Sequence, residues 1–133
     1  MKRFIAVMIA LLLFAGCNST ANNKETDNNT GYKQISQDEA MEIMKSEEDY
    51  IILDVRRPDE FSEGHIQNAV NLPNETIGTD EIKELPEKDQ LILVYCRSGN
   101  RSKQASEKLA ALGYTNIKEF GGINTWSGEI VTE

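Results

Sequence analysis

Two nearly continuous apolar runs of strand length constrain the fold of this chain more than any other feature. They span residues 50–55 and 91–95. A strand that is apolar without alternation is covered on both faces, as in a parallel sheet between two layers of helices. The sequence therefore predicts an α/β domain with a small, mainly parallel sheet flanked by helices.

The segments around these runs alternate between strand and helix signals. Residues 36–39 match a capping box that opens a helix. Residues 101–112 have apolar side chains at helical spacing and stop at Gly113. Three shorter strands are predicted at residues 32–35, 69–72 and 117–120. Without residues 69–72, whose strand signal is weaker, the order β-α-β-β-α-β fits one small domain with right-handed crossovers.

The first 31 residues differ in composition from the rest. Residues 1–16 contain Lys2 and Arg3, an apolar run and small residues before Cys17, which is typical of a signal peptide. The apolar run is shorter than the about 20 residues of a membrane-spanning helix. Residues 18–31 include five asparagines and no large apolar side chain. We therefore expect residues 17–31 to form a flexible tether and residues 32–133 to form the domain.

Residues 13–17, Leu-Phe-Ala-Gly-Cys, resemble the lipobox of bacterial lipoprotein signals, with Phe14 in place of the usual leucine. The resemblance implies cleavage before Cys17, lipidation of its thiol, and an extracytoplasmic protein anchored to the outer face of the cell membrane. An ordinary secretory signal is the alternative. Cleavage removes two of the 14 basic residues and leaves 12 against 22 acidic ones, a net charge of −10. This charge disfavours nucleic acid as a partner.

Cys96 directly follows the second apolar run, and a short polar loop separates it from the next helix. Ligand sites in open α/β sheets lie just beyond the carboxyl ends of strands. Gly99 and Asn100 tolerate the positive φ of a tight loop, which can direct amide groups and a helix N-terminus toward the sulfur. Arg97 and Arg101 add two cations. These surroundings favour a nucleophilic thiolate that needs neither a metal nor a cofactor, rather than a buried structural cysteine.

Residues 96–102, Cys-Arg-Ser-Gly-Asn-Arg-Ser, resemble the active-site loop of rhodanese-family sulfurtransferases, Cys-Arg-x-Gly-x-Arg followed by Ser. Further matching blocks lie at residues 53–61, 63–73, 112–114 and 121–126. The resemblance implies the rhodanese fold and a persulfide on Cys96. It also implies a sulfur donor such as thiosulfate and a thiol or cyanide acceptor. The loop residues implied to contact the anion are Arg97, Ser98, Gly99, Asn100, Arg101 and Ser102.

Three other polar positions have weaker functional signals. Asp54 and Arg56 end the first apolar run and are expected at the same sheet edge as Cys96, where we predict that they support the loop without taking part in catalysis. His65 is the only histidine, so a histidine-based metal site lacks ligands. Its Gly-His-Ile context favours a structural role.

Two other functions stay open. Phosphatases and arsenate reductases related to the cell-cycle phosphatases resemble rhodaneses but have five residues between cysteine and arginine. Only four residues separate Cys96 from Arg101, and this smaller loop suits a sulfur atom better than a tetrahedral oxyanion. The other alternative is a membrane-tethered sensing or binding module that forms the persulfide without turnover. The sequence indicates no particular protein partner.

Overall fold

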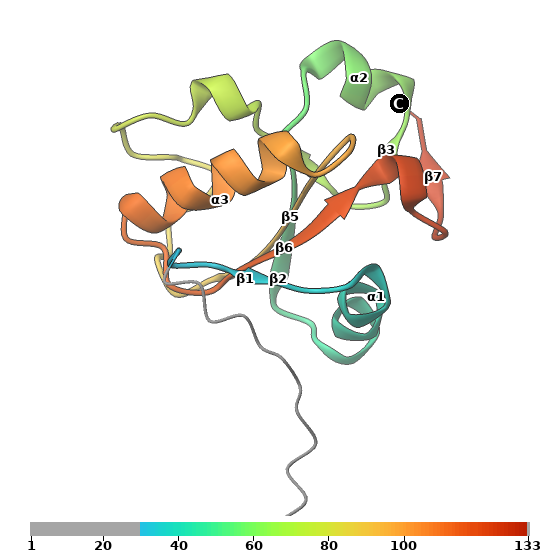
Figure 1. The fold of residues 1–133 in the computed structure, drawn as a ribbon, viewed down its shortest axis with the longest axis horizontal. Coiled ribbons are helices and arrows are strands. Elements are labelled where there is room, and N and C mark those ends of the chain that lie inside the picture. Colours follow the sequence, from blue (N-terminus) through green and yellow to red (C-terminus); the bar gives the residue numbers. More distant parts are fainter. Residues whose placement is uncertain (1–29, 133) are drawn as a thin grey trace, which may run out of the picture.

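Helices cover both faces of a central sheet in the computed structural model, which describes residues 30–132 (Figure 1). The expected signal peptide, residues 1–16, and residues 17–29 of the expected tether lie outside the described residues. Within residues 30–132, no helix is both long enough and apolar enough to cross a membrane.

The central sheet has five strands, all of them parallel, in the order β1-β6-β5-β2-β4. The two apolar runs form β2 (Tyr50–Asp54) and β5 (Leu91–Cys96), which pair side by side. The edge strands are β1 (Lys33–Gln34) and β4 (Val70–Asn71), and β6 (Ile117–Gly122) lies between β1 and β5. The predicted parallel sheet between helices is confirmed.

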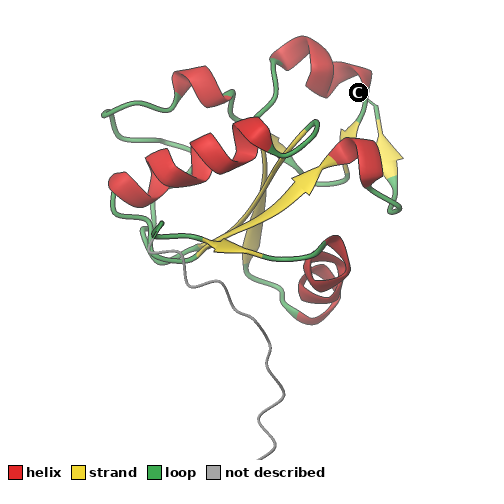
Figure 2. Ribbon diagram, viewed as in Figure 1, coloured by secondary structure: helices red, strands yellow, loops and turns green. Residues whose placement is uncertain are grey.

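Alternation of side chains along β2 and β5 divides the core into two layers. On one face of the sheet, Leu53 belongs to a buried cluster that includes Leu109 of α3 (Asn100–Ala111). On the other face, Ile52 belongs to a second cluster with Ala40 of α1 (Gln37–Ser46). Figure 2 shows these helices in red on the two sides of the yellow strands. Each large aliphatic side chain buried in this way stabilises the fold by roughly 1.5–3 kcal/mol.

The ends of the two long helices follow their sequence signals. Ser36 precedes α1, and its hydroxyl accepts a hydrogen bond from the amide of Glu39 at 3.1 Å. This bond satisfies one of the unpaired N–H groups of the first turn. Gly113 follows α3 and adopts a φ of 96°, a left-handed conformation that ends a helix and favours glycine.

The predicted element order omitted several short elements. They are α2 (Pro58–Glu63), the antiparallel pair β3 (His65–Ile66) and β7 (Ile130–Val131), and 3₁₀ turns at Asn74–Thr76 and Ile123–Thr125. A six-residue helix without a buried side chain and strands of two residues have no hydrophobic periodicity. For α2, Pro58 followed by two acidic residues suits a first helical turn, as the structure has it. The two-residue strands depend on contacts with distant parts of the chain, which sequence spacing alone does not show.

Candidate active site

Cys96 is the last residue of β5, so its side chain lies at the carboxyl edge of the sheet. The residue is 1% exposed and pairs across the sheet with Gly122, the last residue of β6. Asp54 ends the neighbouring strand β2 at the same edge. The structure therefore brings together the three strand ends at which an open α/β sheet places its ligand site.

The loop after Cys96 turns back on the sulfur through Gly99. The Gly99 amide donates a hydrogen bond to Sγ of Cys96 at 3.0 Å. Gly99 precedes the first turn of α3 and has a φ of 108°, which a residue with a Cβ rarely adopts. Positive φ was expected to be available at Asn100 as well, but Asn100 is the first residue of α3 and Gly99 alone makes the turn.

Ser102 connects the sulfur to a carboxyl group. Its hydroxyl oxygen lies 3.3 Å from Sγ of Cys96 and 2.7 Å from Oε1 of Glu119 in β6. The amide of Gly121 donates to the same Oε1 at 2.8 Å. Ser102 and Glu119 are 0% and 3% exposed, so the sulfur of Cys96 has a buried carboxyl group one side chain away.

Glu119 was not among the predicted site residues. The available signal was its spacing of two from Ile117, which places both side chains on one face of β6. Ile117 belongs to the buried cluster on the α3 side. Because Glu119 shares a strand face with this core residue, the sequence indicated that its carboxyl group is buried.

The guanidinium of Arg101 is bound by the carboxylate of Glu60 in α2. Nη1 and Nη2 donate to the two carboxylate oxygens of Glu60 at 2.7 and 3.0 Å. The hydrogen bond from Arg101 lowers the pKa of Glu60 to about 2, although partial burial acts in the opposite direction. The pKa of Arg101 is raised, first by this bond and to a smaller extent by its electrostatic interactions with Glu60 and Cys96. The pair therefore holds a permanent cation beside the loop.

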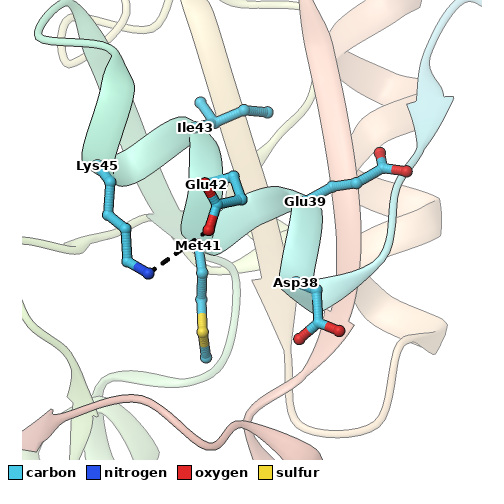
Figure 3. A pocket seen from close by; sticks show the side chains of 6 residues that line it. All are labelled: Asp38, Glu39, Met41, Glu42, Ile43 and Lys45. Atoms are coloured by element: carbon cyan, nitrogen blue, oxygen red, sulfur yellow. Dashed lines mark hydrogen bonds and ion pairs between the residues drawn. The ribbon is translucent and has the colours of Figure 1, made fainter.

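Arg97 and Ser98 form the exposed tip of the loop. Arg97 borders a cavity of about 350 Å³, which is lined by Arg56, Glu60, Glu63, Gly64, Arg97, Ile123 and Asn124. A larger hollow of about 520 Å³ lies along α1 and is shown in Figure 3. None of residues 96–102 lines the hollow on α1. Of these residues only Arg97 lines the smaller cavity, which makes that cavity the candidate substrate site although Cys96 is not among its lining residues.

The predicted supporting pair, Asp54 and Arg56, is buried at the same edge. Nη2 of Arg56 lies 2.7 Å from Oδ2 of Asp54 and donates to the carbonyl of Gly64 at 2.7 Å. The hydroxyl of Tyr95 donates to Oδ2 of Asp54 at 2.7 Å. Burial, and then the charge of Asp54, raise the pKa of Tyr95 well above its usual value, so the hydroxyl stays a donor. Asp54 thus joins the ends of β2 and β5 to the segment before β3.

A second contribution that sequence reasoning missed comes from the double glycine at the end of β6. A Cβ on Gly122 would collide with the backbone carbonyl of Arg97. The amide of Asn124 donates to that carbonyl at 3.2 Å. Gly122 therefore forms a wall of the loop that follows Cys96.

No group of three His, Cys, Asp or Glu side chains within residues 30–132 is arranged to hold a metal ion. His65 is 3% exposed, and its ring stacks on Phe61 with 3.7 Å between centroids. Its Nδ1 lies 2.8 Å from the carbonyl of Phe61. These contacts are those of a packed structural histidine.

The family model described as Rhodanese-like domain matches residues 36–129 of the chain. The chain belongs to the rhodanese family. The match covers the loop at Cys96, both supporting residues and Glu119. The rhodanese domain therefore accounts for nearly all of the described structure.

Curated relatives of this rhodanese domain are named as sulfurtransferases. It is 38% identical over 96 residues to the thiosulfate sulfurtransferase GlpE of Coxiella burnetii, covering 71% of this chain and 87% of the relative. It is 35% identical over 71 residues to the thiosulfate sulfurtransferase PspE of Escherichia coli, covering 53% of this chain and 68% of the relative.

Solved structures share the fold. A rhodanese-related protein from Thermoplasma volcanium aligns with a TM-score of 0.64 and 34% identity, covering 77% of this chain and all of the other. A rhodanese with anions from E. coli aligns with a TM-score of 0.58 and 31% identity, covering 63% of this chain and 99% of the other. The rhodanese fold that the sequence predicted is confirmed.

Proposed function

We propose that this rhodanese domain is a sulfurtransferase that carries sulfane sulfur as a persulfide on Cys96. The observation that carries the proposal is the position of Sγ, 3.0 Å from the Gly99 amide and 3.3 Å from the Ser102 hydroxyl. Both groups can donate to an anionic sulfur, and such charge-assisted bonds are stronger than neutral ones. Relatives at 35–38% identity named as thiosulfate sulfurtransferases support the same activity.

The reaction has two displacement steps. The Cys96 thiolate attacks the outer sulfur of thiosulfate, a new S–S bond forms, and the S–S bond of thiosulfate breaks. Sulfite leaves with the electron pair of that bond. A thiolate or cyanide acceptor then attacks the outer sulfur of the persulfide, and Cys96 leaves as a thiolate. This division into two nucleophilic steps requires no metal or cofactor.

The side chains around the sulfur have complementary roles in this scheme. Arg97 is exposed at the cavity and offers a cation to the sulfonate end of thiosulfate. Arg101 supplies positive charge near Cys96 while Glu60 holds its guanidinium in place. Four residues between Cys96 and Arg101 leave room for one sulfur atom in the loop, which favours sulfur transfer over phosphate ester hydrolysis.

Mass spectrometry of the intact protein tests the proposal. Incubation with thiosulfate is expected to add one sulfur atom, and cyanide is expected to remove it as thiocyanate. The Cys96→Ser variant should gain no sulfur. Repeated thiocyanate production distinguishes turnover from a sensing module that is loaded once. Failure of thiosulfate, a persulfide and every other sulfane-sulfur donor to add mass to the folded protein would overturn the assignment.

We also propose that the domain works outside the cytoplasm on a lipid anchor at Cys17. The support is the sequence of residues 1–17, a basic start and a short apolar run that end in Leu-Phe-Ala-Gly-Cys. The full chain is expected in the membrane fraction of a bacterial host with a diacylglycerol mass on its N-terminal cysteine. The Cys17→Ser variant should lose that mass. Recovery of wild-type protein cleaved at another site would contradict lipidation.

A further inference from the structure

Glu119 is a buried carboxyl group that the sulfur-transfer scheme above does not use. Its Oε1 accepts hydrogen bonds from the Ser102 hydroxyl and the Gly121 amide. Its Oε2 lies 3.5 Å from the side-chain amide of Gln34 in β1. Among the described residues, no lysine or arginine forms an ion pair with it. Burying a carboxylate without a cation lowers the stability of the fold, so packing alone does not explain a glutamate at this position.

The Ser102 hydroxyl has one proton and four possible acceptors: Oε1 of Glu119 at 2.7 Å, the Gly99 carbonyl at 2.9 Å, Sγ of Cys96 at 3.3 Å and the Gly121 carbonyl at 3.4 Å. When Glu119 is ionised, Ser102 donates to it at 2.7 Å and only its lone pairs face Cys96. An oxygen lone pair accepts from a thiol but repels a thiolate. When Glu119 is protonated, it donates to Ser102, and the proton of Ser102 is released to the Gly99 carbonyl or to the sulfur. A thiolate is the stronger of these two acceptors because it is an anion. The protonation state of Glu119 therefore decides which form of Cys96 the serine stabilises.

We propose that Glu119 accepts the thiol proton of Cys96 through Ser102, holds it while the sulfur is anionic, and returns it when the sulfur is discharged. In the first step, the S–H proton of Cys96 moves to the oxygen of Ser102, and the hydroxyl proton of Ser102 moves to Oε1 of Glu119. Ser102 ends with one proton, as it began. Glu119 acts through Ser102 and is a positioning residue with respect to the sulfur.

The shuttle keeps the buried charge constant through the reaction. Before loading, the negative charge is on Glu119, and after proton transfer it is on Cys96. In the loaded state it is on the outer sulfur of the persulfide, while Glu119 is neutral. At no stage are two anions buried side by side, which a low-dielectric site would resist. This inference rests on the proposed function only in taking Cys96 as the reacting sulfur.

Few other charged groups face the Cys96, Ser102 and Glu119 trio. Tyr32 precedes β1, and its pKa is raised by burial and then by the charges of Glu107 and Glu119. Gln34 contributes a neutral amide from β1. From α3, Arg101 interacts electrostatically with Cys96 but is paired with Glu60.

The pH dependence of Cys96 alkylation by iodoacetamide tests the inference, because only the thiolate reacts. While Cys96 and Glu119 share one proton, the fraction of thiolate does not depend on pH. As the pH is lowered, the alkylation rate of the wild-type protein is therefore expected to fall in two steps, with a plateau between them. The Glu119→Gln variant keeps the oxygen that accepts from Ser102. Its alkylation rate should fall in a single step, by about tenfold for each pH unit below the midpoint of that step.

Glu107→Gln is the matched control, since it removes an exposed carboxylate from α3. The control should retain the plateau. A wild-type profile with a single step, or a plateau of equal height in Glu119→Gln, would overturn the inference. The same samples are tested for mass gain with thiosulfate, so that loss of the shuttle and failure of sulfur transfer are distinguishable.

A second measurement does not depend on the folding of a variant. The infrared difference spectrum of wild-type protein before and after loading with thiosulfate should gain a protonated carboxyl band. That band should shift when glutamate is labelled with carbon-13. Loading without a new carboxyl band would mean that Glu119 takes up no proton. That result would overturn the inference but would leave the persulfide on Cys96 unaffected.

Discussion

The guanidinium of Arg101 and the carboxylate of Glu60 form a two-point ion pair, with N–O distances of 2.7 and 3.0 Å. The pair joins the first turn of α3 to α2 across 41 positions of sequence. It fixes the guanidinium of Arg101 beside the loop that follows Cys96. Its contribution to stability depends on the ionisation of Glu60 and can therefore be measured by changing the pH.

Glu60→Gln is expected to lower the free energy of unfolding by about 2 kcal/mol at neutral pH. Since the folded state lowers the pKa of Glu60 from 4.5 to about 2, the stabilisation is fully present above pH 4.5 in the wild type. It is lost as the pH falls toward 2. Urea unfolding of both proteins between pH 7 and pH 2 should show the gap closing, with Glu63→Gln as an exposed control. A gap that is constant with pH would contradict this origin.

Ser102→Ala removes the hydroxyl that lies 3.3 Å from Sγ of Cys96. We expect the rate of persulfide formation with thiosulfate to fall by about tenfold, because one donor to the anionic sulfur is worth roughly 1.4 kcal/mol. Rapid-quench mass spectrometry measures this rate. Ser106→Ala is a matched control, since Ser106 is equally buried and its hydroxyl donates to the backbone carbonyl of Ser102. An equal effect in both variants would show that the loss comes from packing.

Gly122→Ala places a Cβ against the backbone carbonyl of Arg97. The loop must move to accommodate it, and we expect a loss of about 2 kcal/mol in stability together with a more than tenfold slower loading of Cys96. Thermal unfolding and the thiosulfate mass assay measure the two effects. Gly78→Ala adds a methyl group that meets nothing within 4 Å and should be neutral in both. Normal loading of Gly122→Ala would argue against the loop position described above.

Asp54→Asn distinguishes support from catalysis. The change leaves the buried guanidinium of Arg56 without its anion, and removal of one member of a buried pair costs about 3–5 kcal/mol. The loading rate per folded molecule is expected to stay within about threefold of wild type, because Asp54 contacts Tyr95 and Arg56 rather than Cys96. Comparing urea unfolding with the loading rate at low temperature tests this. A large rate loss in fully folded protein would give Asp54 a chemical role.

The central part of the fold could be predicted because its signals are local. The apolar runs that become β2 and β5, the cap at Ser36 and the stop at Gly113 are each visible within a few residues. The position of Cys96 at a strand end followed from the same pattern. Sequence spacing therefore predicted the sheet, the two long helices and the position of Cys96.

Contacts between distant residues could not be predicted in the same way. Arg101 was expected to add charge to the loop, but nothing near it in sequence indicated that Glu60 would bind its guanidinium. Glu119 approaches Ser102 only because β6 lies beside β5 in the sheet. The glycine at position 122 became a wall of the loop for the same reason. Strand order, which single-sequence patterns do not specify, decides these three relationships.

The depth of Cys96 acts as a steric filter. Because the residue is 1% exposed, we expect small donors with an unbranched terminal sulfur to reach it more readily than a disulfide on the surface of a folded protein. Burial of this kind would favour sulfur chemistry with small molecules over thiol exchange with other proteins. A reactive thiol sheltered in this way can persist where an exposed one would be captured.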